Sequence, residues 1–330
     1  ADVVIAVGTR LSDFPTMSWS AWQHPEVRFV TVNVAELDAA KAAALPLVGD
    51  ARETLLELHA ALDARGYAGA SAERRTHIEG LRTAWHKEAT RVLHLAAETH
   101  VSQPEAMRLV NESLGDDGIV VCAAGGLPGD MHKLWRPQTP GSYHMEYGNS
   151  TMGYEIAGGV GVAMAEPERR VHVMVGDGSY LMLANEILSA RQEGIGLTIV
   201  LLDNHGYRCI RNLSGACGAD NPFNDFRARD PRTGTFTGEV LPIDFAANAA
   251  SLGAQVFEAG TPAELEAALR EARAVTDRPA VIVVETNPEP GVPAYDSWWD
   301  VPVAEVSVSE RVHEARAEYE ENLKKERAFV

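Results

Sequence analysis

Two apolar runs, each ending in small and polar residues, constrain the fold of this chain most strongly. The first run, Val171–Val175, leads into a Gly-Asp-Gly-Ser turn that contains Asp177, and the second, Leu197–Leu202, leads into Asn204. Continuous apolar runs of this length are typical of parallel strands buried on both faces. Parallel strands bring their carboxyl ends to one edge of a sheet, where ligands bind. We therefore expect Asp177 and Asn204 to lie close together.

The residues at these strand ends have the chemistry of a cation site. A glycine turn before a helix, here Gly176 to Ser179, presents backbone N–H groups to a phosphate. A carboxylate in the same turn repels a phosphate unless a cation lies between them. The Asp177 carboxylate, the Asn204 amide oxygen and the Gly206 carbonyl form an oxygen set that suits Mg²⁺. Taken alone, the turn is more simply explained as a helix N-cap.

The rest of the chain alternates in the manner of an α/β protein, a parallel sheet flanked by helices. Further strands are expected at Val3–Val7, Arg28–Val34, Gly118–Cys122, Gln255–Glu258 and Ala280–Glu285. Helices are expected at Arg52–Ala64, Glu73–Ala97, Gln103–Leu114, Gly153–Ala165, Tyr180–Gln192, Ile243–Leu252, Pro262–Ala274 and Ser309–Lys325. The stretch from Asn212 to Leu241 is expected to be a long loop, a common place for binding residues.

Three regions follow from this pattern. Residues 1–70 predict the back half of a Rossmann-like middle domain, residues 71–102 a linker helix, and residues 103–330 a binding domain with a C-terminal tail. The chain begins directly with a strand-like run after Ala1. We therefore expect it to be the C-terminal part of a longer protein.

Composition excludes several classes of function. The formal net charge is −18, which argues against a nucleic-acid or anionic-membrane surface. No apolar run approaches the roughly 20 residues that span a bilayer. The three cysteines do not suggest a disulfide framework, which favours a reducing cytoplasm. We expect no nucleic-acid partner and no membrane partner.

The spacing of the two strand ends resembles that of the thiamine-diphosphate-dependent enzymes. Asp177 and Asn204 are 27 positions apart, as in that family's Gly-Asp-Gly and Asn-Asn motif, although Asp203 replaces the first Asn. The resemblance implies thiamine diphosphate and Mg²⁺ as cofactors, with Asp177, Asn204 and Gly206 on the metal. It places further cofactor contacts at Gly125, Gly126, Leu127, Gly129, Ser150, Met152, Gly176, Gly178, Ser179, Asn204 and Gly206. Met152 would support the cofactor in its bent form, although by composition alone it would fill a core gap.

Other stretches resemble the 3D-(3,5/4)-trihydroxycyclohexane-1,2-dione acylhydrolases of myo-inositol catabolism. They include Leu127–Asp130, Tyr143–Gly148, Met152–Glu155 and Ser297–Trp299. The resemblance implies hydrolytic C–C cleavage that opens a cyclic diketone to 5-deoxy-glucuronate. It also implies a homo-oligomer, a dimer or tetramer with sites between subunits, and a further N-terminal domain whose Glu activates the cofactor. We cannot place that domain in these residues, so we expect the isolated chain to be inactive.

Several side chains are candidates for handling protons. His144, His205 and Glu146 lie near the cofactor motifs, and a loop histidine is suited to proton transfer. Each could equally be an exposed or structural residue. Arg208 and Arg211 could meet anionic groups or form a solvated helix face. Two tryptophans, Trp298 and Trp299, more simply pack in the fold, and Cys209 and Cys217 are interpreted as ordinary thiols.

Other functions remain open. An acetolactate-synthase-like or glyoxylate-carboligase-like lyase or ligase would keep the same cofactor residues and differ only around the substrate. The chain could also be an inactive cofactor-binding fragment. A nicotinamide dehydrogenase is disfavoured, because no Gly-x-Gly-x-x-Gly turn with an acidic residue about 20 positions later is present.

Overall fold

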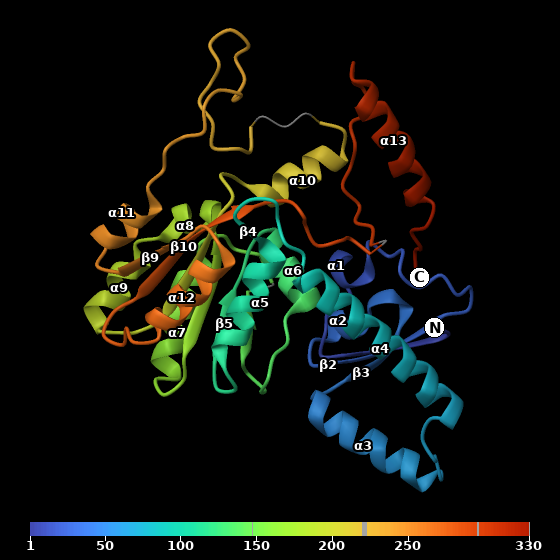
Figure 1. The fold of residues 1–330 in the computed structure, drawn as a ribbon. Helices are drawn as coiled ribbons and strands as arrows, with labels where there is room; N and C mark the ends of the chain where they lie inside the picture. The colour runs from blue at the N-terminus through green and yellow to red at the C-terminus, as the bar shows by residue number, and fades with distance from the viewer. Residues whose placement is uncertain (147, 220–222, 296, 330) are drawn as a thin grey trace. The chain divides into compact units, whose positions relative to one another are not determined.

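The structure is a computed structural model that describes residues 1–146, 148–219, 223–295 and 297–329. The chain forms two compact units (Figure 1). One comprises residues 1–81, 215–219 and 294–330, and the other comprises residues 82–214 and 220–293. By their contacts, residues 294–330 belong to the unit that holds the N-terminal region, whereas the sequence pattern groups them with the binding domain. The helix α4 (Ala72–Leu93) crosses the boundary between the units.

The larger unit is built on a parallel sheet of seven strands (Figure 1). The strand order is β4-β10-β8-β7-β5-β6, and β9 also pairs with β10. The strands are β4 (Val101–Ser102), β5 (Ile119–Cys122), β6 (Tyr143–Met145), β7 (Val171–Gly176), β8 (Thr198–Asp203), β9 (Gln255–Ala259) and β10 (Ala280–Asn287). All their pairings are parallel. The predicted fold class is confirmed.

Helices cover both faces of this sheet, and alternate residues of each strand face opposite layers. In β5, Val120 and Cys122 join one apolar cluster, while Ile119 and Val121 join the other. The first cluster takes side chains from α5 (Gln103–Leu114), α6 (Gly126–Leu134) and α12 (Pro262–Ala272). The second takes them from α7 (Tyr154–Ala165), α8 (Asp177–Leu183), α9 (Glu186–Glu193) and α11 (Phe245–Ser251). The central strands are therefore buried on both sides.

Several elements of this unit differ from the sequence prediction, which does not include the strands β4 and β6. The expected helix Tyr180–Gln192 is two helices, α8 and α9, because Ile187 and Leu188 donate i to i+3 hydrogen bonds to Ala184 and Asn185. The helix α6 is not among the helices expected from the sequence. The helix α10 (Arg208–Ala216) covers the beginning of the expected long loop.

The smaller unit holds a three-stranded parallel sheet in the order β1-β2-β3. The strands are β1 (Val3–Val7), β2 (Arg28–Asn33) and β3 (Leu45–Val48). Its helical segments are α1 (Asp13–Thr16), α2 (Glu36–Ala39), the short 3-10 helix η1 (Lys41–Ala43), α3 (Ala51–Ala64) and α13 (Glu310–Leu323). The first two strands and α3 agree with the sequence prediction to within a residue.

Residues near the C-terminus complete the core of this smaller unit. The Phe329 ring lies 4.8 Å from Phe29 on β2 and 5.8 Å from Trp19, measured between ring centroids. The Arg327 guanidinium donates a 2.8 Å hydrogen bond to the Trp22 carbonyl. The ring centroids of Trp298 and Tyr319, on α13, are 6.3 Å apart, so Trp298 packs in the fold as the sequence predicted.

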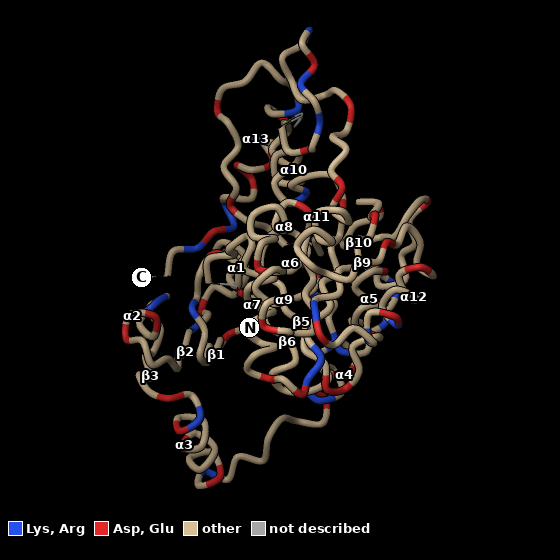
Figure 2. The backbone as a smooth tube through the Cα atoms, turned by 90° about the vertical axis from the view of Figure 1, so that its left-hand side faces the viewer, with Lys and Arg blue, Asp and Glu red and all other residues tan. Residues whose placement is uncertain are grey.

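Charge is distributed along the whole backbone. Acidic residues number 47 and basic residues 29, and Figure 2 shows both kinds on many elements of each unit. Among the described residues, none of the helices is both long enough and apolar enough to cross a bilayer.

Candidate functional site

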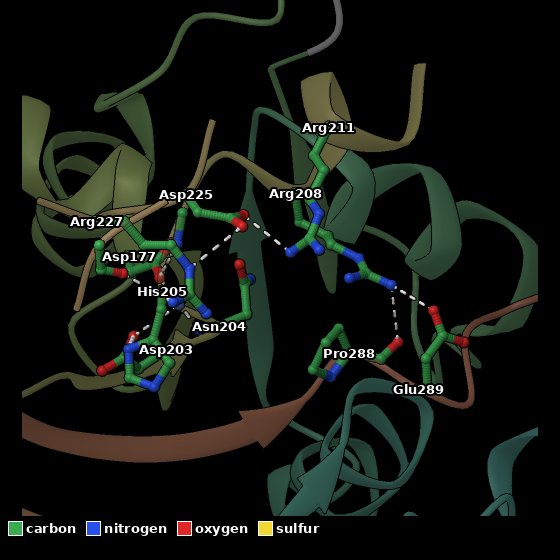
Figure 3. A network of polar contacts seen from close by, with 12 residues as sticks. Asp177, Asp203, Asn204, His205, Arg208, Arg211, Asp225, Arg227, Pro288 and Glu289 are labelled. Carbon is green, nitrogen blue, oxygen red and sulfur yellow. Dashed lines mark hydrogen bonds and ion pairs between the residues drawn. The ribbon is translucent and has the colours of Figure 1, made fainter. Parts of the chain in front are cut away.

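The structure brings Asp177, Asn204 and Gly206 together at the carboxyl edge of the larger sheet (Figure 3). The parallel pairing of β7 with β8 aligns their carboxyl ends, with Gly176 opposite Leu202. The Asp177 Oδ2 atom accepts N–H groups from Asn204 and Gly206, each at 3.0 Å. Its Oδ1 atom accepts the Gly178 N–H at 2.7 Å. The turns that follow the two strands are therefore joined through one carboxylate.

Burial makes this carboxylate electrostatically unusual. Asp177 is 1% exposed, and its burial, followed by the neighbouring Asp203 carboxyl, raises its pKa to about 7. Asp203 is itself 8% exposed. Two buried carboxyl groups side by side disfavour two negative charges. A cation at this edge would offset that repulsion.

The available ligands fit a hard cation. The candidate set consists of a carboxylate, an amide and a backbone carbonyl, and Mg²⁺ prefers such oxygen ligands. No group of three or more His, Cys, Asp or Glu side chains suited to a metal occurs within the described ranges. The residues therefore fit a cation that is shared with another oxygen-rich group, such as a diphosphate, better than a cage made by protein side chains alone.

Two glycines allow the turns to approach one another. A Cβ atom at Gly206 would overlap the backbone carbonyl oxygen of Asn224. A Cβ atom at Gly178 would lie 2.6 Å from the ring of Tyr207. Real Cβ contacts are not this short, so a side chain at either position would push the loops apart.

The amides expected to bind phosphate lie where α6 and α8 begin. The helix α6 starts at Gly126, with Gly125 as its N-cap at a positive φ of 91°, which glycine adopts readily. The first amides of a helix have no partner within it, which favours Gly125, Gly126 and Leu127 over Gly129. The helix α8 starts at Asp177, so the Gly178 and Ser179 amides lie in its first turn. The Gly178 N–H already donates to Asp177 Oδ1, which leaves the Ser179 N–H as the better candidate there.

The turn that contains Ser150 and Met152 is held by Glu146. The Glu146 carboxylate accepts the Thr151 N–H at 2.6 Å and the Asn149 N–H at 2.9 Å. These backbone hydrogen bonds lower the pKa of Glu146, which does not suit it to donate a proton. Met152 is 38% exposed, so its side chain does not simply fill a core gap. Tyr147, in the same motif, lies outside the described residues.

The two candidate histidines differ in their surroundings. The His205 Nδ1 atom lies 3.2 Å from Asp203 Oδ1, and its Nε2 atom lies 3.9 Å from Glu285 Oε1. His205 therefore stands beside Asp177 and Asn204. The His144 Nε2 atom lies 3.1 Å from the carbonyl of Gly141, which precedes β6. This contact directs the His144 ring toward the start of its strand rather than toward the strand ends.

Arginines of α10 and of the loop that follows it form ion pairs near the site (Figure 3). Arg208 Nη2 lies 2.5 Å from Glu289 Oε1. Arg211 Nη1 lies 2.9 Å from Asp225 Oδ1, and the Arg227 Nε atom lies 3.8 Å from Asp225 Oδ2. Each arginine thus already faces a carboxylate. Burial raises the pKa of the Cys209 thiol, in agreement with an ordinary thiol at that position.

Sequence reasoning missed Glu155 as a member of this site. Glu155 is 1% exposed, and it accepts N–H groups from Ala124 at 3.1 Å and Gly153 at 3.0 Å. The Ser179 hydroxyl also donates to it, at 2.7 Å to Oε2 and 2.8 Å to Oε1. The signal was available as a single charged residue inside the apolar run of α7.

Comparison with protein families agrees with this geometry. Residues 1–58 match the central domain of thiamine pyrophosphate enzymes. Residues 123–284 match their C-terminal TPP binding domain, and this range contains every residue that the sequence predicted to hold the cofactor or the metal. The chain belongs to the thiamine pyrophosphate enzymes. Thiamine pyrophosphate is another name for thiamine diphosphate, so the resemblance inferred from the motifs is confirmed.

Two relatives with curated names are hydrolases of the same name. The chain is 37% identical to a 3D-(3,5/4)-trihydroxycyclohexane-1,2-dione hydrolase of Clostridium botulinum strain Alaska E43. It is 38% identical to a hydrolase of the same name from Clostridium perfringens strain ATCC 13124. Both alignments cover 100% of this chain and 54% of the relative. The chain therefore spans about half the length of the curated relatives that it matches.

A solved structure supports the fold. The Rhodococcus jostii RHA1 thiamine diphosphate-dependent 4-hydroxybenzoylformate decarboxylase aligns with a TM-score of 0.64 at 20% identity. The alignment covers 88% of this chain and 50% of that one. At this identity, the likeness extends to the fold alone.

Proposed function

We propose that this chain provides the diphosphate- and Mg²⁺-binding part of a thiamine-diphosphate-dependent hydrolase. The proposed reaction opens a trihydroxycyclohexane-1,2-dione to 5-deoxy-glucuronate by C–C cleavage in myo-inositol catabolism. The observation that carries the proposal is the Asp177 carboxylate, which joins the ends of β7 and β8 inside the domain matched to TPP binding. The names of the curated relatives support the choice of substrate in this proposal.

The binding roles follow from the positions of the residues. Asp177, the Asn204 amide oxygen and the Gly206 carbonyl hold Mg²⁺. The N–H groups of Gly126 and Leu127 in the first turn of α6, and of Ser179 in the first turn of α8, would bind the phosphate groups. Met152, whose side chain is exposed, and the turn around Ser150 would contact the organic part of the cofactor.

When bound, thiamine diphosphate supplies the electron sink for C–C cleavage. The chain's own residues bind and orient it. His205, between Asp203 and Glu285, is placed to hold a proton at the edge of the site. His144 lacks such a position, so we assign proton handling to His205.

The complete enzyme requires groups that this region does not supply. We propose that the glutamate that activates the cofactor comes from the part of the relatives that this chain does not match, and that the sites form between subunits of a homo-oligomer. The free thiols Cys122, Cys209 and Cys217 support a reducing compartment such as the cytoplasm.

Calorimetric titration of this chain with thiamine diphosphate, with and without Mg²⁺, tests the proposal. We expect saturable binding that requires Mg²⁺, and no turnover of the cyclic dione by the chain alone. Binding that is equally tight in EDTA would contradict the metal assignment. A chain that binds neither thiamine diphosphate nor inorganic pyrophosphate with Mg²⁺ would contradict the proposed binding role.

A further inference from the structure

Glu155 connects three segments that are far apart in the sequence. Ala124 precedes α6, Gly153 caps α7, and Ser179 lies in the first turn of α8. Each donates a hydrogen bond to the Glu155 carboxylate at 2.7 to 3.1 Å. The Gly153 N–H also donates to Ser179 Oγ at 2.8 Å. These three segments are the ones expected to surround the cofactor.

Burial of the Glu155 charge costs free energy unless other groups compensate for it. Ile156 and Val160, on the same helix, are buried apolar residues, and an apolar side chain would fill the position of Glu155 without desolvating a charge. Over the described chain, neither lysine nor arginine forms an ion pair with Glu155. Its compensation comes from the three donors and from its place in the first turn of α7, where the helix dipole favours negative charge.

We propose that Glu155 is a positioning residue that sets the three cofactor-binding turns relative to one another. One carboxylate accepts hydrogen bonds on both oxygens, so a displacement of any of the three segments breaks its own hydrogen bond to the group that the other two share. The inference rests on the proposed function, because it assigns these turns to thiamine diphosphate. It concerns residues of this chain alone.

The same geometry limits what Ser179 can do. A hydroxyl has one proton to donate, and Ser179 Oγ lies within hydrogen-bond distance of both Glu155 oxygens, so the Glu155 carboxylate accepts that proton. Ser179 is therefore left with its backbone N–H to offer a phosphate. The Ser179 side chain then affects the cofactor through Glu155 and not by direct contact.

A double-mutant cycle on Glu155 and Ser179 tests this arrangement. Glu155→Gln keeps the size of the side chain but replaces one acceptor oxygen with a donor. We expect it to weaken Mg²⁺-dependent thiamine diphosphate binding about 10- to 100-fold, the effect of losing a hydrogen bond to a charged group. Ser179→Ala should weaken binding in the wild-type background and have little further effect in the Glu155→Gln background.

Hydrogen exchange provides a readout that needs no cofactor. In Glu155→Gln, amides 123–129, 151–153 and 176–179 should exchange faster, while those of β10 should keep their wild-type rates. Uniformly faster exchange would mean a general loss of stability and would overturn the positioning role. The matched control is Glu166→Gln, at the exposed opposite end of α7, which should leave both affinity and exchange unchanged.

The outcomes separate this inference from the proposed function. If the wild-type chain binds thiamine diphosphate and Glu155→Gln binds it with the same affinity, this inference is overturned and the proposed function is not. Fully additive losses in the double variant would overturn the indirect role of Ser179. Absence of binding in the wild-type chain would overturn the proposed function together with this inference.

Discussion

In the seven-stranded sheet, β5 and β8 are buried along their whole length, whereas β3 of the three-stranded sheet is exposed along its whole length. Helices cover both faces of the larger sheet, and its two apolar clusters include most of the buried residues of this chain. In the smaller sheet, Leu45 is 62% exposed and Val48 is 56% exposed. The buried cluster there consists of Ala6, Leu11 and Phe29 with partly buried neighbours.

This difference explains why a candidate site can be identified at the strand ends of the larger sheet. Where strands are packed on both faces, the polar groups at their ends are held in place and their charges are desolvated. Asp177 and Glu155 both show this combination of burial and defined hydrogen bonds. The smaller sheet leaves apolar side chains exposed, so its own contacts define less of its structure. Substitutions should therefore have unequal effects in the two regions.

The largest expected contrast is between Ile199→Ala and Leu45→Ala. Ile199 on β8 is fully buried, so its truncation should cost about 2 to 5 kcal/mol of unfolding free energy through lost burial and a cavity. Leu45 is largely exposed, and the same change there should stay within about 0.5 kcal/mol. Urea denaturation followed by circular dichroism measures both. Equal losses of unfolding free energy in the two variants would mean that Leu45 is packed more tightly than the contacts of the smaller sheet indicate.

A smaller effect is expected from Gly206→Ala. The new methyl group would overlap the backbone of Asn224, so we expect a loss of about 1 to 3 kcal/mol and weaker cofactor binding. Gly161→Ala is the control within α7, because an added Cβ there meets nothing within 4 Å. That change should stabilise the helix by up to about 1 kcal/mol. A harmless Gly206→Ala would show that the two loops need not approach closely.

The third prediction concerns acid stability. His172 on β7 is buried, and neither of its ring nitrogens has a hydrogen-bond partner among the described residues. Burial lowers its pKa from 6.5 to about 3. Between these values the unfolded chain binds a proton that the folded chain does not. Stability from this group should therefore fall as pH drops below about 6.5, by up to about 1.4 kcal/mol per pH unit.

His172→Phe should remove this part of the acid sensitivity. Unfolding free energies measured from pH 7 to pH 4 should fall less steeply in the variant than in the wild type. The control is His59→Phe on exposed α3, which adds the same ring outside the larger sheet. An unaltered pH dependence in His172→Phe would show that this histidine does not contribute to acid sensitivity.

Much of the larger sheet could be predicted from sequence, because strands buried on both faces leave unbroken apolar runs. The runs before Asp177 and Asn204 gave both the strands and their common edge, and the spacing between them gave the family. The strand β3 escaped prediction, because Leu45–Val48 is short and contains Pro46. The helix α6 escaped because Gly126, Pro128 and Gly129 disfavour a helix by local propensity, and tertiary packing of Leu127 and Met131 decided the outcome.

The side-chain network of the site was less predictable than its backbone. That Glu155 would meet Ala124, Gly153 and Ser179 depends on how three separate segments pack, and no spacing in the sequence encodes it. The same holds for the ion pairs of Asp225 with Arg211 and Arg227. The motifs identified the candidate ligands. The contacts that hold these residues in place could be identified only from the folded structure.

The central claim is that the buried carboxylate at the end of β7 holds the cation that joins this chain to a diphosphate. Its most direct test is calorimetric titration of Asp177→Ala with thiamine diphosphate and Mg²⁺, beside wild type and Asp277→Ala, an exposed aspartate on the loop before β10. We predict that Asp177→Ala loses Mg²⁺-dependent binding by about 100-fold or more, as expected when a charged ligand is removed, while Asp277→Ala binds like wild type. Wild-type affinity in Asp177→Ala, with an unchanged requirement for Mg²⁺, would contradict the claim.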